Sequence, residues 1–476
     1  MVIGVVGLGG LQAPWEIATA DEVIYVAGVR NLVERGTLAT NFYLPHSILR
    51  QGHPHRDVHM PGYLFLLAGP VLALGAGFAA ALVLNVAALA ACATLGYRLA
   101  RGIGCGRGRA TAAAAFLVST PPLPGYVWLA FPEVAIAAIT LLGLLAGLRA
   151  RDARTAALAG IAFAMGPLLR ESLLLHLPFF LLLIPFRPFL LGFLPAGMLA
   201  LAAVSFLFGR GRAVHANQLF PSILEDSLRE GDPWGALSAR VAENVARNLG
   251  RLAELDPFAH AEDAVLVFEA VLFAAVLGLL PRLEGRSRRL ALAFGMVLAL
   301  LVPAVLALFV TRAVGRVWGG VRALMPLVPV GVVLLVGNVH PRSRIRGPAI
   351  GAAAVLALGL TTWQLRFIDW WKQHDGEAQR RFSDAVAPAV DPYHPRRILV
   401  RGNEAFLFGL ERWPVEVVWP LRSDEELLLL ERTLAFDFVV VPRSEPMKHV
   451  LNASNPRYER VVGDGSGRWR VWRRRY

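Results

Sequence analysis

Long apolar segments constrain the fold of this chain more than any other feature. Ten segments approach or reach the length of about 20 residues that a helix needs to cross a bilayer. They lie near 79–97, 110–129, 133–148, 155–169, 172–186, 189–208, 264–281, 290–311, 322–338 and 347–366. We expect residues 1–19 to be the outer part of a further, first helix whose start is missing. The sequence therefore predicts a polytopic α-helical membrane protein with about eleven transmembrane helices.

The composition supports a membrane protein and argues against several soluble domains. Of the 476 residues, 55% are hydrophobic and 17% are charged, and the mean hydropathy is +0.51. The net charge is +13, yet residues 368–476 hold 18 basic and 16 acidic side chains, so most of the excess lies in the apolar region. Because no compact basic domain carries this charge, nucleic acid is excluded as a partner. All but two of the 48 basic residues are Arg, the exceptions being Lys372 and Lys448.

Arginine is concentrated at alternate junctions between the apolar segments, which predicts the topology. If the spans simply alternate, 15 Arg face only two acids on one side, and the positive-inside rule makes that side cytoplasmic. The first outer loop (20–78) and the long outer loop (209–263) then face outward. Counting 61–75 as a span would reverse the later loops, so we expect this segment, interrupted by Pro70, to be an interfacial or re-entrant helix.

The charge and pattern change near residue 367, which divides the chain into two predicted domains. Residues 1–367 form the transmembrane domain, and residues 368–476 form a small C-terminal extracytoplasmic α/β domain. In this tail the pattern predicts helices and strands in alternation, as in a small sheet domain. The strands are expected at 397–401, 414–418, 436–441, 457–462 and 468–473, and the helices at 403–412 and 423–435. The tail carries neither a glycine-rich phosphate loop nor a cluster of metal ligands, so we expect it to be accessory.

Acidic residues lie at two outward-facing helix starts. Asp21 and Glu22 open the first outer loop, where a carboxylate at the membrane boundary can deprotonate a hydroxyl. The alternative is helix capping, because Thr19 and Glu22 have the spacing of a capping box. Glu133 follows Pro132 at the start of another span, which is also an ordinary helix beginning.

Basic residues on the same outer side are candidates to bind an anion, because the positive-inside rule disfavours them there. Arg170 lies next to Glu171 between two short apolar stretches, where an internal ion pair is the alternative. Arg312, Arg316 and Arg322 surround a later outer loop. Snorkelling explains one or two such residues, whereas three suggest a lipid phosphate held by guanidinium groups.

Two candidate substrate-binding residues, His59 and Tyr63, flank Pro61 and Gly62 at the start of the segment 61–75. An imidazole here is either simply solvated or binds a phosphate or an acceptor hydroxyl. His53 and His55 lie nearby, but their spacing matches no standard zinc motif, and we predict no metal site. In the long outer loop, residues 233–255 form an amphipathic pattern that predicts an interfacial helix or a substrate lid.

Taken in order, these motifs resemble the GT-C superfamily of integral-membrane glycosyltransferases. The similarity is to glycosyltransferase family 39, the protein O-mannosyltransferase and aminoarabinose-transferase type. It rests on Asp21-Glu22, on Pro61-Gly62-Tyr63, on Phe131-Pro132-Glu133, and on two stretches that contain Arg170-Glu171 and Arg322. His59-Met60 departs from the acid–Lys pair that aminoarabinose transferases carry before the proline.

The resemblance implies a GT-C catalytic domain that transfers a sugar from a polyprenyl phosphate to a hydroxyl, with inversion and without a metal or other cofactor. It implies that Asp21 is the general base, that Glu22 and Glu133 hold substrate, and that Arg170 and Arg322 bind the donor phosphate. The implied partners are the lipid-linked donor, a glycan, lipid or protein acceptor, and the bilayer of a bacterial inner membrane. The alternatives are a transporter or flippase of lipid-linked sugars, which needs charged residues at mid-membrane, and a non-catalytic assembly protein of the same fold.

Overall fold

A computed structural model describes most of the helical region and the strands of the tail. The described residues are 20–38, 42–43, 56–58, 61–75, 78–150, 152–211, 213–215, 232–308, 322, 324–338, 346–393, 397–400, 416–418, 436–442, 457–461 and 469–475.

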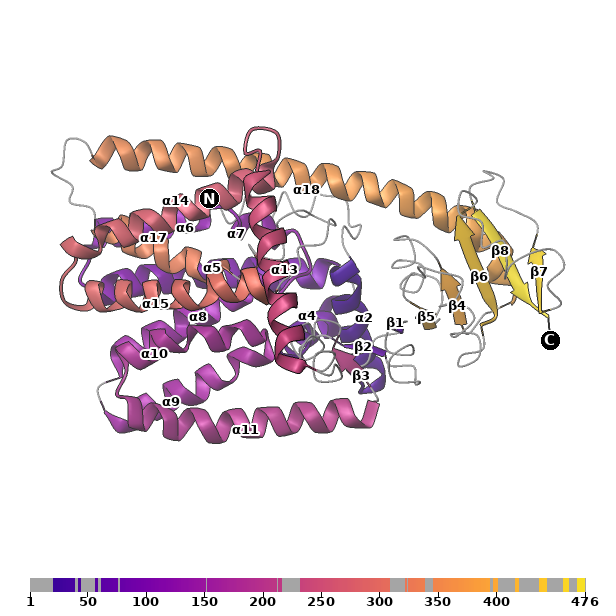
Figure 1. Ribbon diagram of the computed structural model, residues 1–476, viewed down its shortest axis with the longest axis horizontal. Helices are drawn as coiled ribbons and strands as arrows, with labels where there is room; N and C mark the ends of the chain where they lie inside the picture. The colour runs from indigo at the N-terminus through magenta and orange to yellow at the C-terminus, as the bar shows by residue number, and fades with distance from the viewer. Residues whose placement is uncertain are drawn as a thin grey trace. The chain divides into compact units, whose positions relative to one another are not determined.

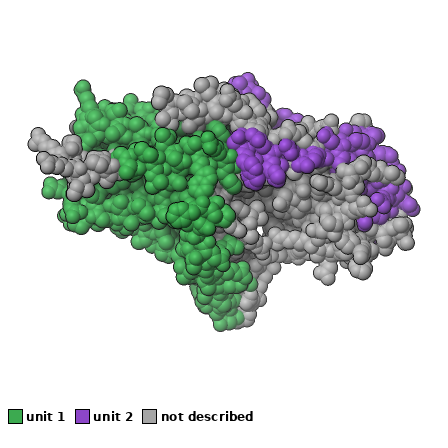
Figure 2. All heavy atoms as spheres, turned by 90° about the horizontal axis from the view of Figure 1, so that it is seen from above, with its two compact units in different colours: residues 1–13, 81–203, 218–368 green, residues 14–80, 204–217, 369–476 purple. Residues whose placement is uncertain are grey.

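The chain divides into two compact units, which are coloured separately in Figure 2. Unit 1 comprises residues 1–13, 81–203 and 218–368. Unit 2 comprises residues 14–80, 204–217 and 369–476. The last of these limits falls one residue after the boundary that the sequence predicted at 367/368. The first outer loop and part of the long outer loop, however, group with the tail.

Unit 1 is helical, as the apolar segments predict (Figure 1). Its described helices are α5 (Phe78–Gly102), α6 (Arg107–Val118), α7 (Leu123–Val127), α8 (Glu133–Arg149), α9 (Ala153–Ala164), α10 (Leu177–Leu183), α11 (Phe186–Gly211), α13 (Pro233–Ala253), α14 (Ala261–Leu279), α15 (Gly285–Leu308), α17 (Leu327–Asn338) and α18 (Arg346–Val390). Of these, α5, α11 and α18 have residues in both units. Short 3₁₀ turns, η1 (Gly166–Leu168), η2 (Glu171–His176) and η3 (Leu280–Arg282), lie between some of them.

The helices are apolar enough for a polytopic membrane protein. Within the described ranges, four are also long enough to cross a bilayer: Phe78–Gly102, Asp263–Arg282, Gly285–Ala307 and Gly351–His374. Five further apolar helices are shorter. The predicted spans 155–169 and 172–186 are among these, because α9 ends at Ala164, η1 begins at Gly166 and the chain is irregular at Arg170. In the part of the chain that the structure describes, the helices that are long enough to cross a bilayer are therefore fewer than the eleven spans that we expected.

Glycine brings α9 and α11 into direct backbone contact. A Cβ at Gly160 would collide with the carbonyl oxygen of Phe189, and a Cβ at Gly192 would collide with that of Ala157. Small residues allow such close approach between membrane helices, where packing rather than the hydrophobic effect drives association. The aromatic rings of Phe163 and Phe180 pack beside this crossing, with centroids 4.1 Å apart.

The segment 61–75 forms a helix of 14 residues, α4 (Pro61–Leu74), with Pro70 inside it. In unit 2 it packs against α2 (Ala20–Arg35), where the rings of Tyr63 and Tyr25 meet edge to face at a centroid distance of 5.1 Å. Its length falls short of the roughly 20 residues that span a bilayer. Whether it crosses the membrane stays a prediction.

The sheet of unit 2 has eight strands in the order β3-β2-β1-β5-β4-β6-β8-β7. The strands are β1 (Phe42–Tyr43), β2 (Arg56–Val58), β3 (Ala213–His215), β4 (Arg397–Val400), β5 (Glu416–Val418), β6 (Phe438–Pro442), β7 (Tyr458–Val461) and β8 (Trp469–Arg474). Strands β5, β4 and β6 run parallel, and β8 and β7 continue the sheet in antiparallel pairs. All five strands predicted in the tail are present, whereas the two predicted tail helices fall outside the described residues.

Both outer loops add strands to this sheet, which the sequence pattern did not indicate. Strand β1 pairs in parallel with β5 of the tail, through Phe42 and Val417. Strand β2 pairs with β1 and with β3, the strand from the long outer loop. This pairing explains why the first outer loop belongs to the same compact unit as the tail.

Candidate functional site

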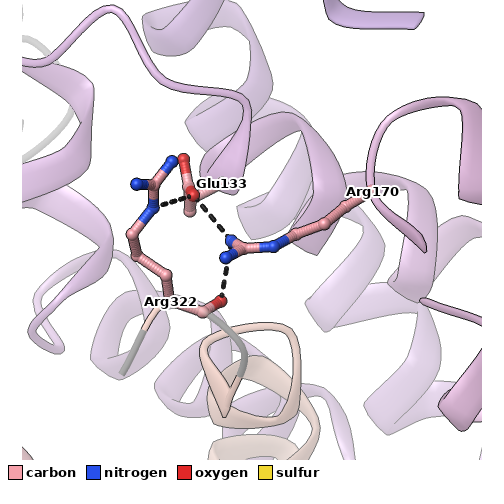
Figure 3. A network of polar contacts seen from close by, with 3 residues as sticks. All are labelled: Glu133, Arg170 and Arg322. Atoms are coloured by element: carbon pink, nitrogen blue, oxygen red, sulfur yellow. Dashed lines mark hydrogen bonds and ion pairs between the residues drawn. The ribbon is translucent and has the colours of Figure 1, made fainter. Parts of the chain in front are cut away.

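Three residues from distant parts of the sequence meet in unit 1, and Figure 3 shows them (Glu133, Arg170 and Arg322). Glu133 is the first residue of α8, Arg170 directly precedes η2, and Arg322 lies just before α17. Arg170 Nη1 and Arg322 Nε donate to the same carboxylate oxygen, Glu133 Oε1, at 2.7 and 2.6 Å. Arg170 Nη1 also lies 3.3 Å from the carbonyl oxygen of Arg322, so the two arginines are joined directly.

The cluster is largely buried and carries one net positive charge. The side chain of Glu133 is 1% exposed, while those of Arg170 and Arg322 are 16% and 14% exposed. The second oxygen, Glu133 Oε2, is buried and has no hydrogen-bond partner among the described residues. Two guanidinium groups held by one carboxylate are suited to act as a preorganised anion site, because a guanidinium group carries five N–H donors in a fixed planar arrangement.

Aromatic and amide side chains support this cluster. The guanidinium carbon of Arg322 lies 4.3 Å from the ring centroid of Phe131, in a cation–π arrangement. Phe131 in turn lies 6.0 Å from the ring of Tyr126, which is fully buried on α7. The amide of Asn85 on α5 donates to the carbonyl oxygen of Leu129 at 2.7 Å, which fixes the segment between α7 and α8.

A second acid near this cluster was missed by the sequence reasoning. Glu269, on α14, is fully buried, and neither of its carboxylate oxygens has a hydrogen-bond partner within the described part of the chain. Tyr126 lies within electrostatic range of Glu269 as well as of Glu133, Arg170 and Arg322. The signal was available, since Glu269 is the single ionisable residue in the apolar segment 264–281, and an acid within a membrane segment is a functional candidate by default.

Unit 2 contains a separate group of polar residues around the first outer helix. Asp21 lies in the first turn of α2, but its side chain is outside the described residues. The Glu22 carboxylate is fully buried, and its Oε1 lies 3.5 Å from Nζ of Lys372 on α18. Lys372 Nζ also lies 3.5 Å from the ring centroid of Phe78. A buried ion pair therefore holds Glu22, and this pair was not predicted from the sequence.

The remaining predicted site residues lie apart from these contacts or outside the description. Tyr63 was expected to bind substrate, but its side chain is fully buried against Tyr25. His59, Arg312 and Arg316 fall outside the described residues, as do His53 and His55, the other members of the metal alternative. The tail was expected to be accessory, yet Lys372, close to its start, contacts Glu22 of the first outer loop.

Comparison with solved structures places this geometry in a known fold. ArnT from Cupriavidus metallidurans bound to undecaprenyl phosphate is similar over 99% of this chain and 96% of its own, with a TM-score of 0.63 and 14% sequence identity. This chain therefore shares the fold of that ArnT. The apo state of the same ArnT is similar over the same shares of both chains, with a TM-score of 0.58 and 14% identity. No protein-family model and no curated protein matches the chain by sequence.

The resemblance that the sequence motifs indicated is thus confirmed at the level of fold. With the apolar helices, the likeness supports a multi-pass membrane protein that shares the fold of this ArnT over nearly its whole length.

Proposed function

We propose that this chain is an integral-membrane glycosyltransferase that takes a sugar from a polyprenyl-phosphate donor. The observation that carries the proposal is the pair of guanidinium groups on Glu133, at positions where the resemblance expects donor-phosphate contacts. The similarity to an ArnT structure that binds undecaprenyl phosphate supports the same donor class. A lipid phosphate brings negative charge to the membrane boundary, and bidentate arginine contacts suit that charge.

The proposed reaction is an in-line displacement at the anomeric carbon. Asp21 takes the proton of the acceptor hydroxyl, whose oxygen forms the new glycosidic bond on the face opposite the leaving group. The bond from the anomeric carbon to the phosphate oxygen breaks, and its electron pair stays on the polyprenyl phosphate. Arg170 and Arg322 stabilise this developing charge, and the configuration of the sugar inverts. Neither a metal nor another cofactor is part of this proposal.

The acceptor is a hydroxyl of a glycan, a lipid or a protein, and the transfer takes place on the extracytoplasmic side of a bacterial inner membrane. A transporter or flippase would instead move the lipid-linked sugar without breaking a bond. A purified-protein assay with polyprenyl-phosphate sugars separates these outcomes, since only transfer releases polyprenyl phosphate. Movement of intact donor across a vesicle membrane, without its consumption, would contradict the proposal.

Replacing Arg322 by Ala is expected to weaken donor binding about ten- to a hundredfold, the loss of one charge-assisted contact. Glu133 keeps Arg170 as a partner in this variant, so the fold should survive. The measurement is the Kd for undecaprenyl phosphate in detergent. Arg381→Ala is the matched control, because Arg381 forms an exposed ion pair with Glu377 on α18. An unchanged donor Kd in Arg322→Ala would make this residue a membrane anchor only.

The tail is proposed to lie outside the cytoplasm. If the first of eleven predicted spans begins on the cytoplasmic side and each span crosses the membrane once, residue 367 lies on the outer side. Alkaline phosphatase fused after Tyr476 is expected to be active, since it folds only in an oxidising compartment. A cytoplasmic reporter that is active at the same position would refute this topology and the shared outer face of the candidate residues.

A further inference from the structure

Lys372 is a fully buried cation at the start of the tail. It lies on α18, beyond the predicted last span of 347–366 but within the apolar helix Gly351–His374. Its ammonium group contacts two described side chains of the same unit. One is the carboxylate of Glu22, at 3.5 Å between Nζ and Oε1, and the other is the ring of Phe78, at 3.5 Å from Nζ to the centroid. Both members of the ion pair are inaccessible to solvent.

The identity of this residue is informative because of the composition of the chain. Arginine fills all but two of the 48 basic positions, so a lysine here departs from the prevailing choice. An ammonium group is a compact point charge, whereas a guanidinium group is a broad planar fork. A compact cation suits the space between one carboxylate and one aromatic face. The geometry therefore gives a physical reason for lysine at this position.

Burial of the Glu22–Lys372 ion pair costs enough free energy that its presence needs an explanation beyond stability. Burying two charges carries a desolvation penalty, and such pairs are often no more stabilising than apolar side chains of the same volume. Their best-attested use is to fix one arrangement among several. Here the carboxylate belongs to the first turn of α2, directly after Asp21.

We propose that Lys372 is a positioning residue of the transferase site: its ion pair with Glu22 fixes the first turn of α2, which carries Asp21. The proposal rests on the function proposed above and adds the tail helix to the parts that the reaction needs. It also assigns Glu22 to positioning rather than to proton transfer, since its carboxylate is engaged and buried. Lys372 acts through Glu22 and does not contact substrate.

The experiment is a double-mutant cycle with Glu22→Gln, Lys372→Met and the two combined, together with Lys372→Arg. Turnover with a polyprenyl-phosphate sugar, the Kd for undecaprenyl phosphate and the thermal unfolding midpoint are measured for each. We expect Lys372→Met to lower kcat about tenfold or more while the donor Kd stays within about twofold, because phosphate contacts lie elsewhere. The double variant should be no slower than Lys372→Met, and Lys372→Arg should not restore turnover.

The matched control is Arg381→Met, which removes an exposed cation paired with Glu377 on the same helix. If Lys372→Met alone does not fold, the uncharged double variant, which leaves no unpaired buried charge, supplies the comparison with wild type. A folded Lys372→Met or double variant with wild-type kcat would overturn the positioning role, as would a loss confined to the donor Kd or additive losses in the cycle. Absence of transfer in the wild type would instead refute the proposed function itself.

Discussion

The Asp21→Asn variant is expected to fold, to bind the lipid donor and to lose transfer by about 10²–10⁴, the usual contribution of a general base. Asparagine keeps the size of the side chain and removes its ability to accept a proton. Because the donor phosphate is assigned to Arg170 and Arg322, binding of undecaprenyl phosphate should not change. Single-turnover transfer and the donor Kd, measured on the same detergent-purified preparation, separate the two effects.

The same substitution also tests the alternative of helix capping. Asparagine caps a helix about as well as aspartate, so a residue that only caps should tolerate this change with near-normal turnover. Glu34→Gln is the matched control on the same helix, since Glu34 forms an exposed ion pair with Arg30. A folded Asp21→Asn protein that turns over like the wild type would end the proposed role of Asp21.

Replacing Glu133 by Ala is expected to be the most damaging single change to the stability of unit 1. It leaves two largely buried guanidinium groups joined to each other but without their carboxylate. Removing one partner from a buried ion pair typically costs about 3–5 kcal/mol, mostly through the charge left behind. We therefore expect a large fall in the thermal unfolding midpoint and loss of undecaprenyl-phosphate binding at temperatures where the wild type is folded.

Two further variants make the role of Glu133 specific. Glu133→Gln keeps a carbonyl oxygen that accepts hydrogen bonds, so it should retain more stability than Ala. Glu284→Ala, at an exposed position before α15, should leave the unfolding midpoint unchanged. If Glu133→Ala unfolds at the wild-type temperature, then the guanidinium pair does not depend on this carboxylate, and the preorganised anion site would have to be abandoned.

The sequence predicted that Glu133, Arg170 and Arg322 share one face of the membrane, and the structure brings the three into contact. Residues at outward ends of spans share one surface layer whatever the packing of the helices, and the Arg-rich junctions identify the opposite side. The pattern cannot reveal that both arginines share one carboxylate oxygen. That depends on how α8, η2 and α17 approach one another, and packing of apolar membrane helices has little sequence signal beyond small residues.

The contacts of unit 2 could not be predicted from the sequence, for a related reason. Strands β1, β2 and β3 contain two or three residues each, too few to show the alternation that identifies a strand. The pairing of Glu22 with Lys372 joins residues about 350 positions apart, which no local pattern encodes. The tail strands were predicted because each is longer or lies in a regular strand–helix alternation.

The sheet of unit 2 also dictates when this protein can finish folding. Phe42 pairs with Val417, and Val58 pairs with His215, so one sheet draws on three regions made at very different times. During synthesis the chain emerges from the first residue onward at about 5–20 residues per second, and the helices of unit 1 are made between these regions. The edge of β1 that pairs with β5 therefore stays unpaired until the tail has been synthesised. Because the tail is synthesised last, the sheet of unit 2 can close only after all the helices that lie between its strands in the sequence have been made.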